Sequence, residues 1–175
     1  MAVRPVLIYP DPRLKAPSSK VGEIDTDINQ FIDDLIDTMY DAPGCVGLAA
    51  PQLGMPKRII LVDISRNPKC DQSLGLQVLI NPEIVRQEGQ STAREGCLSL
   101  PHLTANVARA TSISVRALLR QGEKIIFDAF DFHARVLLHE IDHLDGILFL
   151  DRVASLKTDV FRRKRYQVSN KATDN

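Results

Sequence analysis

Apolar side chains recur at helical spacing in two parts of this chain. Between Asp25 and Tyr40 they return every three or four residues with acidic residues on the opposite face, and Asp25 or Thr26 is available as the N-cap. A second helix is predicted to open at 131–133, within a region whose apolar run continues over 136–150. The pattern therefore predicts an amphipathic helix near the N-terminus and a more apolar helix near the C-terminus. The packing residues of the second helix are Ala134, Leu137, Leu138, Ile141, Leu144 and Leu148.

Stretches rich in β-favouring side chains lie between the two helices. They are 46–50, 58–64, 76–82, 107–116 and 123–130. A short strand or extended arm is expected at 6–9, before a proline-rich turn, and the polar segment 65–75 is expected to be a loop. The residues Gln-Gly-Glu at 121–123 separate the last two runs and predict a hairpin there.

Length, charge and cysteine count limit the kind of protein this is. A chain of 175 residues is long enough for one domain with a hydrophobic core. Its 22 basic and 22 acidic residues give a formal charge of zero, so no overall field attracts nucleic acid or an anionic membrane. No apolar run reaches the roughly 18 residues of a spanning helix, and prolines interrupt the apolar N-terminus. Because the three cysteines are also an odd number, we expect a soluble, unexported protein of a reducing compartment.

The segment His139-Glu140-Ile141-Asp142-His143 carries the strongest chemical signal. Two histidines four residues apart on a helix differ by about 40° and roughly 6 Å, so both rings can reach one metal ion. Glu140 lies about 100° from His139 around the helix, where it can act on water at the metal without being a ligand. This H-E-x-x-H arrangement is typical of metal-dependent hydrolases, although the histidines of such a helix can also be ordinary core or surface residues. The other histidines, His102 and His133, are not expected to be ligands.

Cys97 is the candidate for a third ligand. The surrounding sequence predicts an exposed strand end or turn, whereas Cys45 and Cys70 have no partner motif. One thiolate and two imidazoles favour Zn²⁺ or Fe²⁺ over Mg²⁺ or Ca²⁺, and three protein ligands leave one position open, as in catalytic zinc sites. The alternative is an ordinary strand-end cysteine with no metal.

With an open position for water, Glu140 is the natural proton acceptor and donor. It would take a proton from water as the water attacks a carbonyl, and pass one to the departing amine. The side-chain amide of Gln52 and the backbone N–H of Leu98 can donate hydrogen bonds to the developing oxyanion. The residues alone therefore predict metal-assisted hydrolysis of an amide. A peptidase or other amidase, and a non-catalytic metal-binding module that docks on ribosomes, stay open as alternatives.

Three motifs together resemble those of bacterial-type peptide deformylases. They are Val-Gly-Leu-Ala-Ala-Pro-Gln at 46–52, Glu-Gly-Cys-Leu-Ser at 95–99 and His-Glu-Ile-Asp-His-Leu-Asp-Gly at 139–146, and the resemblance covers about the first 150 residues. It implies removal of the formyl group from the N-terminal formyl-methionine of nascent chains, with release of formate. It also implies an α+β fold in which antiparallel strands pack around a central C-terminal metal-binding helix, with an amphipathic helix nearer the N-terminus.

The resemblance also implies a role for each site residue. The metal would be one divalent ion, with Fe²⁺ as the native metal and Zn²⁺, Ni²⁺ or Co²⁺ as substitutes. The implied roles are metal ligand for Cys97, His139 and His143, acid–base group for Glu140, oxyanion donor for Gln52 and the N–H of Leu98, and methionine-site lining for Val46 and Gly47.

The expected organisation is a catalytic deformylase-like domain at 1–152, followed by a basic tail at 153–175 that is partly helical or disordered. The basic cluster 162–165 prompts the hypothesis of a transient contact with the ribosome. The expected substrates are nascent formyl-methionyl polypeptides, with no membrane and no specific DNA as partners. The expected location is the bacterial cytoplasm or an organelle of bacterial descent.

Three positions depart from the usual pattern of that family. Cys45 stands where the first motif usually has glycine, and its thiol is expected to narrow the pocket or to be a site of oxidation. Leu138 stands where Gln usually precedes the first ligand histidine, so a hydrogen bond near the metal is missing or comes from another residue. Thr104 stands where many members have Arg, and altered affinity for longer peptides is expected. All three leave the ligands and the catalytic carboxylate in place, so activity is expected.

Overall fold

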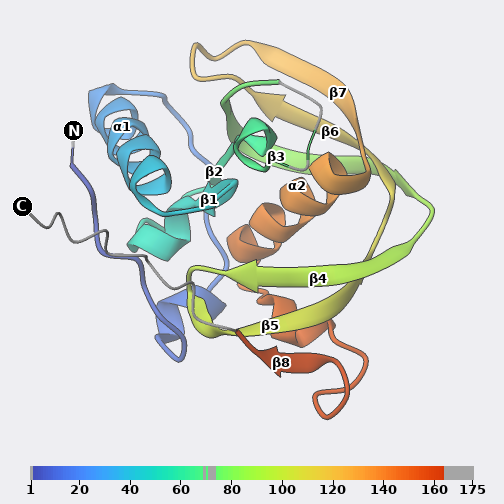
Figure 1. Ribbon diagram of the computed structural model, residues 1–175. Helices are drawn as coiled ribbons and strands as arrows, with labels where there is room; N and C mark the ends of the chain where they lie inside the picture. Colours follow the sequence, from blue (N-terminus) through green and yellow to red (C-terminus); the bar gives the residue numbers. More distant parts are fainter. Residues whose placement is uncertain (1, 69, 71–73, 164–175) are drawn as a thin grey trace, which may run out of the picture.

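Two antiparallel sheets and the helix between them form the frame of the molecule (Figure 1). The structure, a computed structural model, describes residues 2–68, 70 and 74–163. The larger sheet has the strand order β1-β2-β3-β6-β7, the smaller has β4-β5-β8, and all neighbouring strands are antiparallel. This confirms the expected α+β fold. The strands are β1 (Gly47–Ala49), β2 (Ile59–Val62), β3 (Gln77–Glu88), β4 (Ser91–Cys97), β5 (Leu100–Arg109), β6 (Ser112–Leu118), β7 (Lys124–Phe130) and β8 (Val160–Arg162).

The helix between the sheets is α2 (Asp131–Leu144), the predicted C-terminal helix (Figure 1). Leu137, Ile141 and Leu144 pack against the larger sheet in one buried cluster. On the other side of the helix, Arg135 and His139 form hydrogen bonds with β4 of the smaller sheet. The apolar face therefore anchors the helix, and its polar face is turned towards the strand that carries the candidate cysteine.

Gly146 follows α2 in a left-handed backbone conformation. Its φ is +70°, and its N–H donates to the carbonyl of His143 at 3.2 Å. A Cβ at this position would lie 2.5 Å from the carbonyl oxygen of Lys15, so glycine lets the N-terminal segment pack against the helix end. This contact fixes the last turn of α2, which carries the second histidine of the motif.

Strand β2 separates two core clusters. Ile60 and Val62 face α2, whereas Ile59 and Leu61 face helix α1 (Thr26–Asp41) on the opposite side of the sheet. Successive side chains of a strand point to opposite faces, so a strand that is covered on both faces is apolar throughout. The predicted amphipathic helix is confirmed, and Asp25 caps it by accepting a hydrogen bond from a backbone N–H of the first turn at 2.8 Å.

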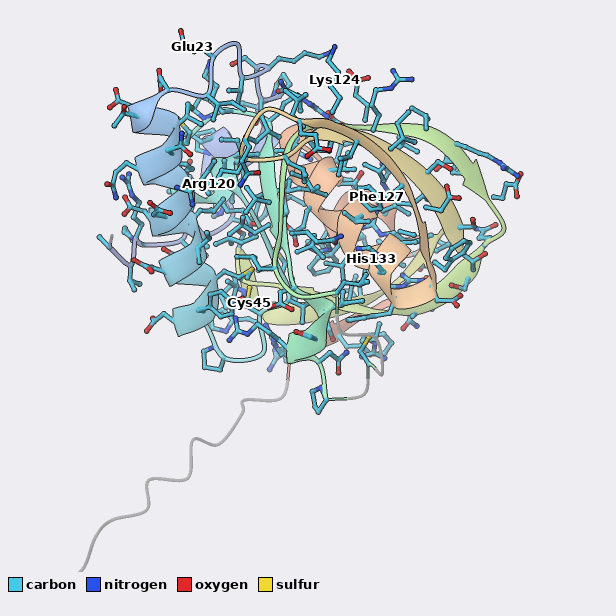
Figure 2. All side chains as sticks on the ribbon, turned by 90° about the horizontal axis from the view of Figure 1, so that it is seen from above. Glu23, Cys45, Arg120, Lys124, Phe127 and His133 are labelled. Carbon is cyan, nitrogen blue, oxygen red and sulfur yellow. The ribbon has the colours of Figure 1, made fainter. Side chains whose placement is uncertain are left out.

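The predicted hairpin is also confirmed, because β6 and β7 pair across the turn that contains Arg120. The guanidinium of Arg120 reaches α1, where Nε donates to Asn29 Oδ1 at 2.9 Å and Nη1 donates to Asp33 Oδ1 at 2.7 Å. Figure 2 shows this residue beside α1, at the far end of the hairpin from Phe127. The hairpin and the first helix are therefore joined across the larger sheet.

Two strand predictions are wrong in their bounds. The single strand expected at 107–116 is divided between β5 and β6, because the chain turns at Thr111, whose N–H donates to the carbonyl of Glu88 at 3.1 Å. Strand β3 was expected to end at Pro82 but continues to Glu88. A register shift at the proline lets the pairing with β6 resume beyond it.

The segment 6–9 is an extended arm rather than a strand. Its Leu7 N–H donates to the carbonyl of Gln52 at 2.8 Å, and its Tyr9 N–H donates to the carbonyl of Ser99 at 2.9 Å. The arm therefore connects two segments that are far apart in the sequence.

The described part of 153–175 contains a strand and no helix. Strand β8 pairs with β5, with Leu103 opposite Arg162. The rest of the predicted tail, including Lys164 and Arg165 of the basic cluster, lies outside the described residues. Among the described helices, none is long and apolar enough to cross a membrane.

Candidate active site and metal centre

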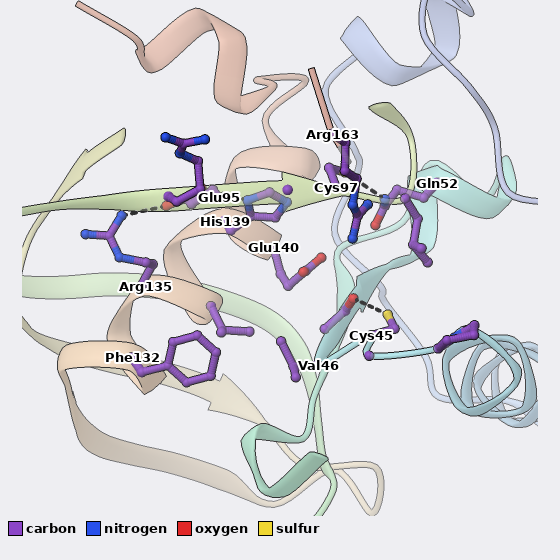
Figure 3. A pocket seen from close by; sticks show the side chains of 17 residues that line it. Cys45, Val46, Gln52, Glu95, Cys97, Phe132, Arg135, His139, Glu140 and Arg163 are labelled. Atoms are coloured by element: carbon purple, nitrogen blue, oxygen red, sulfur yellow. Dashed lines mark hydrogen bonds and ion pairs between the residues drawn. The ribbon is translucent and has the colours of Figure 1, made fainter. Parts of the chain in front are cut away.

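A cavity of about 220 Å³ opens between β1, the end of β4 and the polar face of α2 (Figure 3). Every candidate site residue except His143 lines it, and His143 contacts the lining residue Cys97. The three sequence motifs, which are separated by 39 or more residues along the chain, therefore meet in one place. The lining residues used below are Gln52, Arg94, Cys97, Leu98, Glu140 and Arg163.

Cys97, His139 and His143 bring their ligand atoms within 4.8 Å of one another, and they are the one such group found among the described residues. Cys97 Sγ lies 3.3 Å from His143 Nε2. One sulfur and two imidazole nitrogens suit Fe²⁺, Zn²⁺ and neighbouring transition metals, so the residues present fit a divalent ion of this kind.

Cys97 is buried, contrary to the exposed strand end expected from the sequence. Only 6% of its surface is exposed, because the turn after β4 is covered by Leu14, Leu148 and Phe149. Burial raises the pKa of the Cys97 thiol, but the imidazoles of His143 and His139 outweigh this effect and hold the pKa well below its ordinary value. The cysteine is therefore poised to be a thiolate, the form that binds metal.

The ring of His139 is oriented by Glu95, a residue that the sequence analysis missed as a partner. His139 Nδ1 donates to Glu95 Oε2 at 2.9 Å, which leaves its other ring nitrogen for the metal. Glu95 lies two residues before Cys97 on β4, so both side chains are on one face of the strand. The two-residue spacing of Glu95 and Cys97 was therefore the sequence feature that could have identified Glu95 as a partner of the ligand group.

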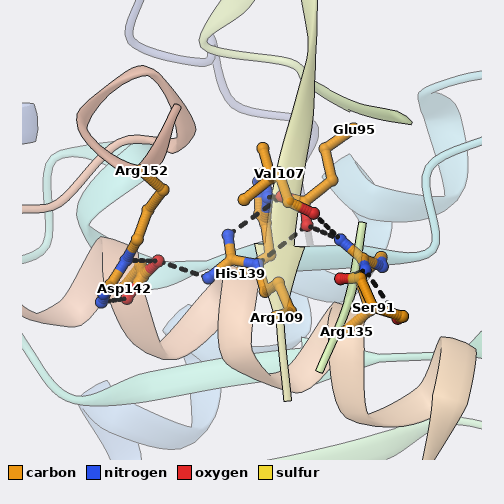
Figure 4. A network of polar contacts seen from close by, with 8 residues as sticks. All are labelled: Ser91, Glu95, Val107, Arg109, Arg135, His139, Asp142 and Arg152. Atoms are coloured by element: carbon orange, nitrogen blue, oxygen red, sulfur yellow. Dashed lines mark hydrogen bonds and ion pairs between the residues drawn. The ribbon is translucent and has the colours of Figure 1, made fainter. Parts of the chain in front are cut away.

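Glu95 belongs to a buried network of charged side chains (Figure 4). Arg109 donates to both oxygens of Glu95, at 2.8 and 2.9 Å, and Arg135 donates to Glu95 Oε1 at 2.8 Å. Arg109 also donates to Asp142 Oδ2 at 2.6 Å, and Arg152 binds the same carboxylate. Because each buried carboxylate has guanidinium partners, the network holds β4, β5 and α2 in fixed relative positions.

The network also fixes the charge of Glu95. Burial opposes ionisation of this carboxyl, but the hydrogen bonds from Arg109 and His139 outweigh burial and hold its pKa well below the ordinary value. Glu95 is therefore a permanent acceptor for the His139 N–H at neutral pH.

Glu140 points into the cavity from α2 (Figure 3). It is 4% exposed, and its buried Oε2 has no hydrogen-bond partner among the described residues. Burial raises the pKa of Glu140 to about 7. A Cβ on Gly47 would lie 2.5 Å from Glu140 Oε1, so the bare backbone of β1 leaves the space that this carboxylate occupies.

Gln52 is 2% exposed and is held at both ends of its amide. Its Oε1 accepts a hydrogen bond from the N–H of Ala49 at 2.9 Å, and its Nε2 donates to Ser99 Oγ at 3.1 Å. Nε2 also lies 3.5 Å from Cys97 Sγ. The donor end of Gln52 is therefore turned towards the candidate ligand, and Leu98 lines the same cavity.

The two histidines that were excluded as ligands lie outside this cluster. His133 Nε2 pairs with Gln77 Oε1 at 2.6 Å, and its ring stacks on Phe127 at a centroid distance of 6.0 Å (Figure 2). His102 lies in β5, where its carbonyl accepts the N–H of Arg163 at 2.8 Å.

The three unusual positions are accommodated in different ways. Cys45 Sγ donates to the carbonyl of Gly47 at 3.0 Å, and burial raises its pKa to about 12, so the protonated thiol is favoured at neutral pH. Leu138 packs, partly buried, against the core cluster of α2. Thr104 Oγ1 accepts a hydrogen bond from Arg94 Nη1 at 3.3 Å.

Comparison with known proteins agrees with this geometry. The model of the polypeptide deformylase family matches residues 3–159. A peptide deformylase of Thermodesulfovibrio yellowstonii is 47% identical over 164 residues, which cover 94% of this chain and 97% of that protein, and one of Acidobacterium capsulatum is 43% identical over 164 residues and 94% of each chain. The crystal structure of a peptide deformylase from Legionella pneumophila matches with a TM-score of 0.81 at 40% identity and covers 89% of each chain. On these grounds the chain belongs to the peptide deformylase family.

Proposed function

We propose that Cys97, His139 and His143 hold the divalent metal ion with which this hydrolase removes the N-formyl group from newly made proteins. The donor set suits Fe²⁺ as the native ion, with Zn²⁺, Ni²⁺ or Co²⁺ as substitutes. When bound, such an ion supplies Lewis-acid polarisation of a carbonyl oxygen and lowers the pKa of water. The chain itself supplies orientation of the ligands, through Glu95, and the movement of protons.

Glu140 is the proposed acid–base group, and its position is the observation that carries the proposal. Its Oε2 is buried in the cavity without a partner among the described residues, directly beside the ligand cluster. A carboxyl with a pKa of about 7 exchanges protons readily at neutral pH, as general acid–base catalysis requires. Glu140 would therefore take a proton from the attacking water and deliver one to the amine that leaves with the peptide.

Gln52 and the N–H of Leu98 are the proposed donors to the oxyanion that develops on the formyl oxygen. The hydrogen bond from Ala49 to Gln52 Oε1 supports this role, because it prevents the amide from turning its acceptor end into the cavity. A donor that is held in place before the reaction, as the Gln52 amide is, needs no reorganisation as charge develops.

The remaining functional assignments are proposals of the same kind. Val46 and Gly47 would line the methionine site, since their strand borders the cavity opposite Glu140. The catalytic domain would span 1–152, with β8 as an extension of its smaller sheet. We propose nascent formyl-methionyl chains as substrates, the cytoplasm or an organelle of bacterial descent as the location, and a ribosome contact through 162–165.

The test compares Glu140→Gln with wild-type protein after anaerobic loading with Fe²⁺ or Ni²⁺. We expect the variant to keep its metal but to lose about 10²- to 10⁴-fold in the rate of formate release from a formyl-methionyl peptide. Glu23→Gln, on the exposed surface, is the matched control (Figure 2). Wild-type protein that releases no formate yet cuts internal peptide bonds would instead identify a peptidase.

A further inference from the structure

A guanidinium group lies at the mouth of the cavity without a carboxylate partner. Arg94, on β4, lines the cavity and has its Cζ 3.6 Å from the centroid of the Phe161 ring. Its Nε donates to Asn106 Oδ1 at 3.1 Å and its Nη1 donates to Thr104 Oγ1 at 3.3 Å. All three partners are neutral, and Arg94 forms no ion pair with any residue that the structure describes.

The other cavity arginines have different surroundings. Arg135 is buried and bound to Glu95, so its charge is compensated. Arg163 also lines the cavity, and its Cζ lies 3.6 Å from the position that a Cβ on Gly96 would take. Gly96, two residues after Arg94 on β4, therefore lies beside Arg163.

The acidic residues that line the cavity do not pair with Arg94. Glu95 is buried and already bound by arginines, and Glu140 is 4% exposed and faces the ligand cluster. Arg94 therefore places a positive charge at the mouth of the cavity, although the whole chain has a formal charge of zero.

We propose that Arg94 forms a subsite for a carboxylate side chain in the substrate, shortly after the formyl-methionine. This inference rests on the proposed function, because it places the N-terminus of the substrate at the ligand cluster and the following residues at the mouth. Arg94 lies three residues before Cys97 on β4, about 10 Å along a strand that rises about 3.3 Å per residue. An extended peptide rises by the same amount per residue, so the subsite would take one of the first residues after the methionine. A guanidinium fork matches a carboxylate in both charge and geometry.

The contacts of Arg94 prepare it for this role. Stacking on Phe161 and two hydrogen bonds from the guanidinium restrict the side chain before substrate binds, which reduces the conformational entropy lost on binding. The two hydrogen bonds use Nε and one N–H of Nη1. The other N–H groups of the guanidinium are available to a carboxylate. Because the side chain is exposed, the preference should be modest, about three- to tenfold, and should weaken with salt.

The experiment measures kcat/KM for formate release from formyl-Met-Ala-Ala-Ala amide and from three versions with one glutamate at the second, third or fourth position. For wild-type protein we expect one acidic peptide to be preferred about three- to tenfold over the neutral one. Arg94→Gln should bring this ratio close to one, and Arg94→Lys should retain part of it. Arg86→Gln, an exposed arginine paired with Glu88 on β3, is the control and should leave the ratio unchanged.

Several results would overturn the inference. One is that wild-type protein shows no preference for an acidic peptide, and another is that the preference persists in Arg94→Gln. A third is that Arg94→Gln lowers kcat/KM equally for neutral and acidic peptides, which would indicate a contact with the peptide backbone. A preference that appears only in peptides with a free C-terminal carboxylate would assign the subsite to a chain end instead. If wild-type protein releases formate from none of the peptides, the proposed function itself is refuted. This result differs from every result that refutes the subsite alone.

Discussion

Replacing Gly47 with alanine would create a steric clash with the side chain of Glu140. The new Cβ would lie 2.5 Å from Oε1, 2.9 Å from Cγ and 3.0 Å from Cδ of the glutamate, whereas ordinary contacts begin at 3.4 Å. To restore an ordinary contact the carboxylate must move by about 0.9 Å, and misplacement on this scale costs about 10²-fold in rate. Gly47→Ala should therefore lower kcat for formate release about 100-fold.

The same substitution should leave the metal content unchanged, because the clash is with Glu140 and not with a proposed ligand. The assay is steady-state formate release, together with metal analysis and a thermal unfolding curve for each sample. Gly22→Ala is the matched control, since a Cβ there meets nothing within 4 Å. If kcat of the folded, metal-loaded Gly47→Ala protein stays within about threefold of wild type, Glu140 does not need the position described here.

Two further predictions concern the metal centre and the stability of the fold. Glu95→Gln should weaken metal binding about 10- to 100-fold, measured by competition with a chelator, because His139 loses its anionic partner. The control Glu83→Gln, at a partly exposed position away from the site, should leave the affinity unchanged, and equal affinities of Glu95→Gln and wild type would contradict the role of the network. Asp34→Asn should lower the free energy of unfolding by about 1 kcal/mol at neutral pH, because hydrogen bonds from Arg4 hold the pKa of Asp34 below its ordinary 3.8. This stabilisation is complete above the unfolded-state pKa and is lost as the pH falls through the folded-state pKa. Urea unfolding at several pH values should therefore show the wild type and the variant converging in acid, and a constant difference would argue against the ion pair.

Local sequence patterns were sufficient to predict the first helix and the β6–β7 hairpin. The spacing over 25–40 predicts α1, and the Gln-Gly-Glu turn predicts the hairpin, because each depends on neighbours in the sequence. The break between β5 and β6 was missed for the same reason. Ala110 and Thr111 carry no glycine or proline and fit an extended strand, whereas the turn depends on a hydrogen bond to Glu88, which is distant in the sequence.

At the site, the residue types predicted the ligand group, because H-E-x-x-H has a fixed geometry on a helix. The partners of those residues could not be found in the same way. Arg109 joins Glu95 and Asp142, which are 14 and 33 positions away, and no local pattern relates them. The burial of Cys97 likewise depends on distant residues that cover the turn after β4.

The N-terminal arm has a thermodynamic consequence for catalysis. Through Leu7 and Tyr9 it holds the carbonyls of Gln52 and Ser99, and thus the backbone around both proposed oxyanion donors. Local opening of the arm would release these two segments together, so the fraction of molecules with a fully assembled site depends on the free energy of that opening. Linkage requires the converse as well: a ligand that binds only the assembled site must hold the arm closed and slow the hydrogen exchange of the Leu7 and Tyr9 amides.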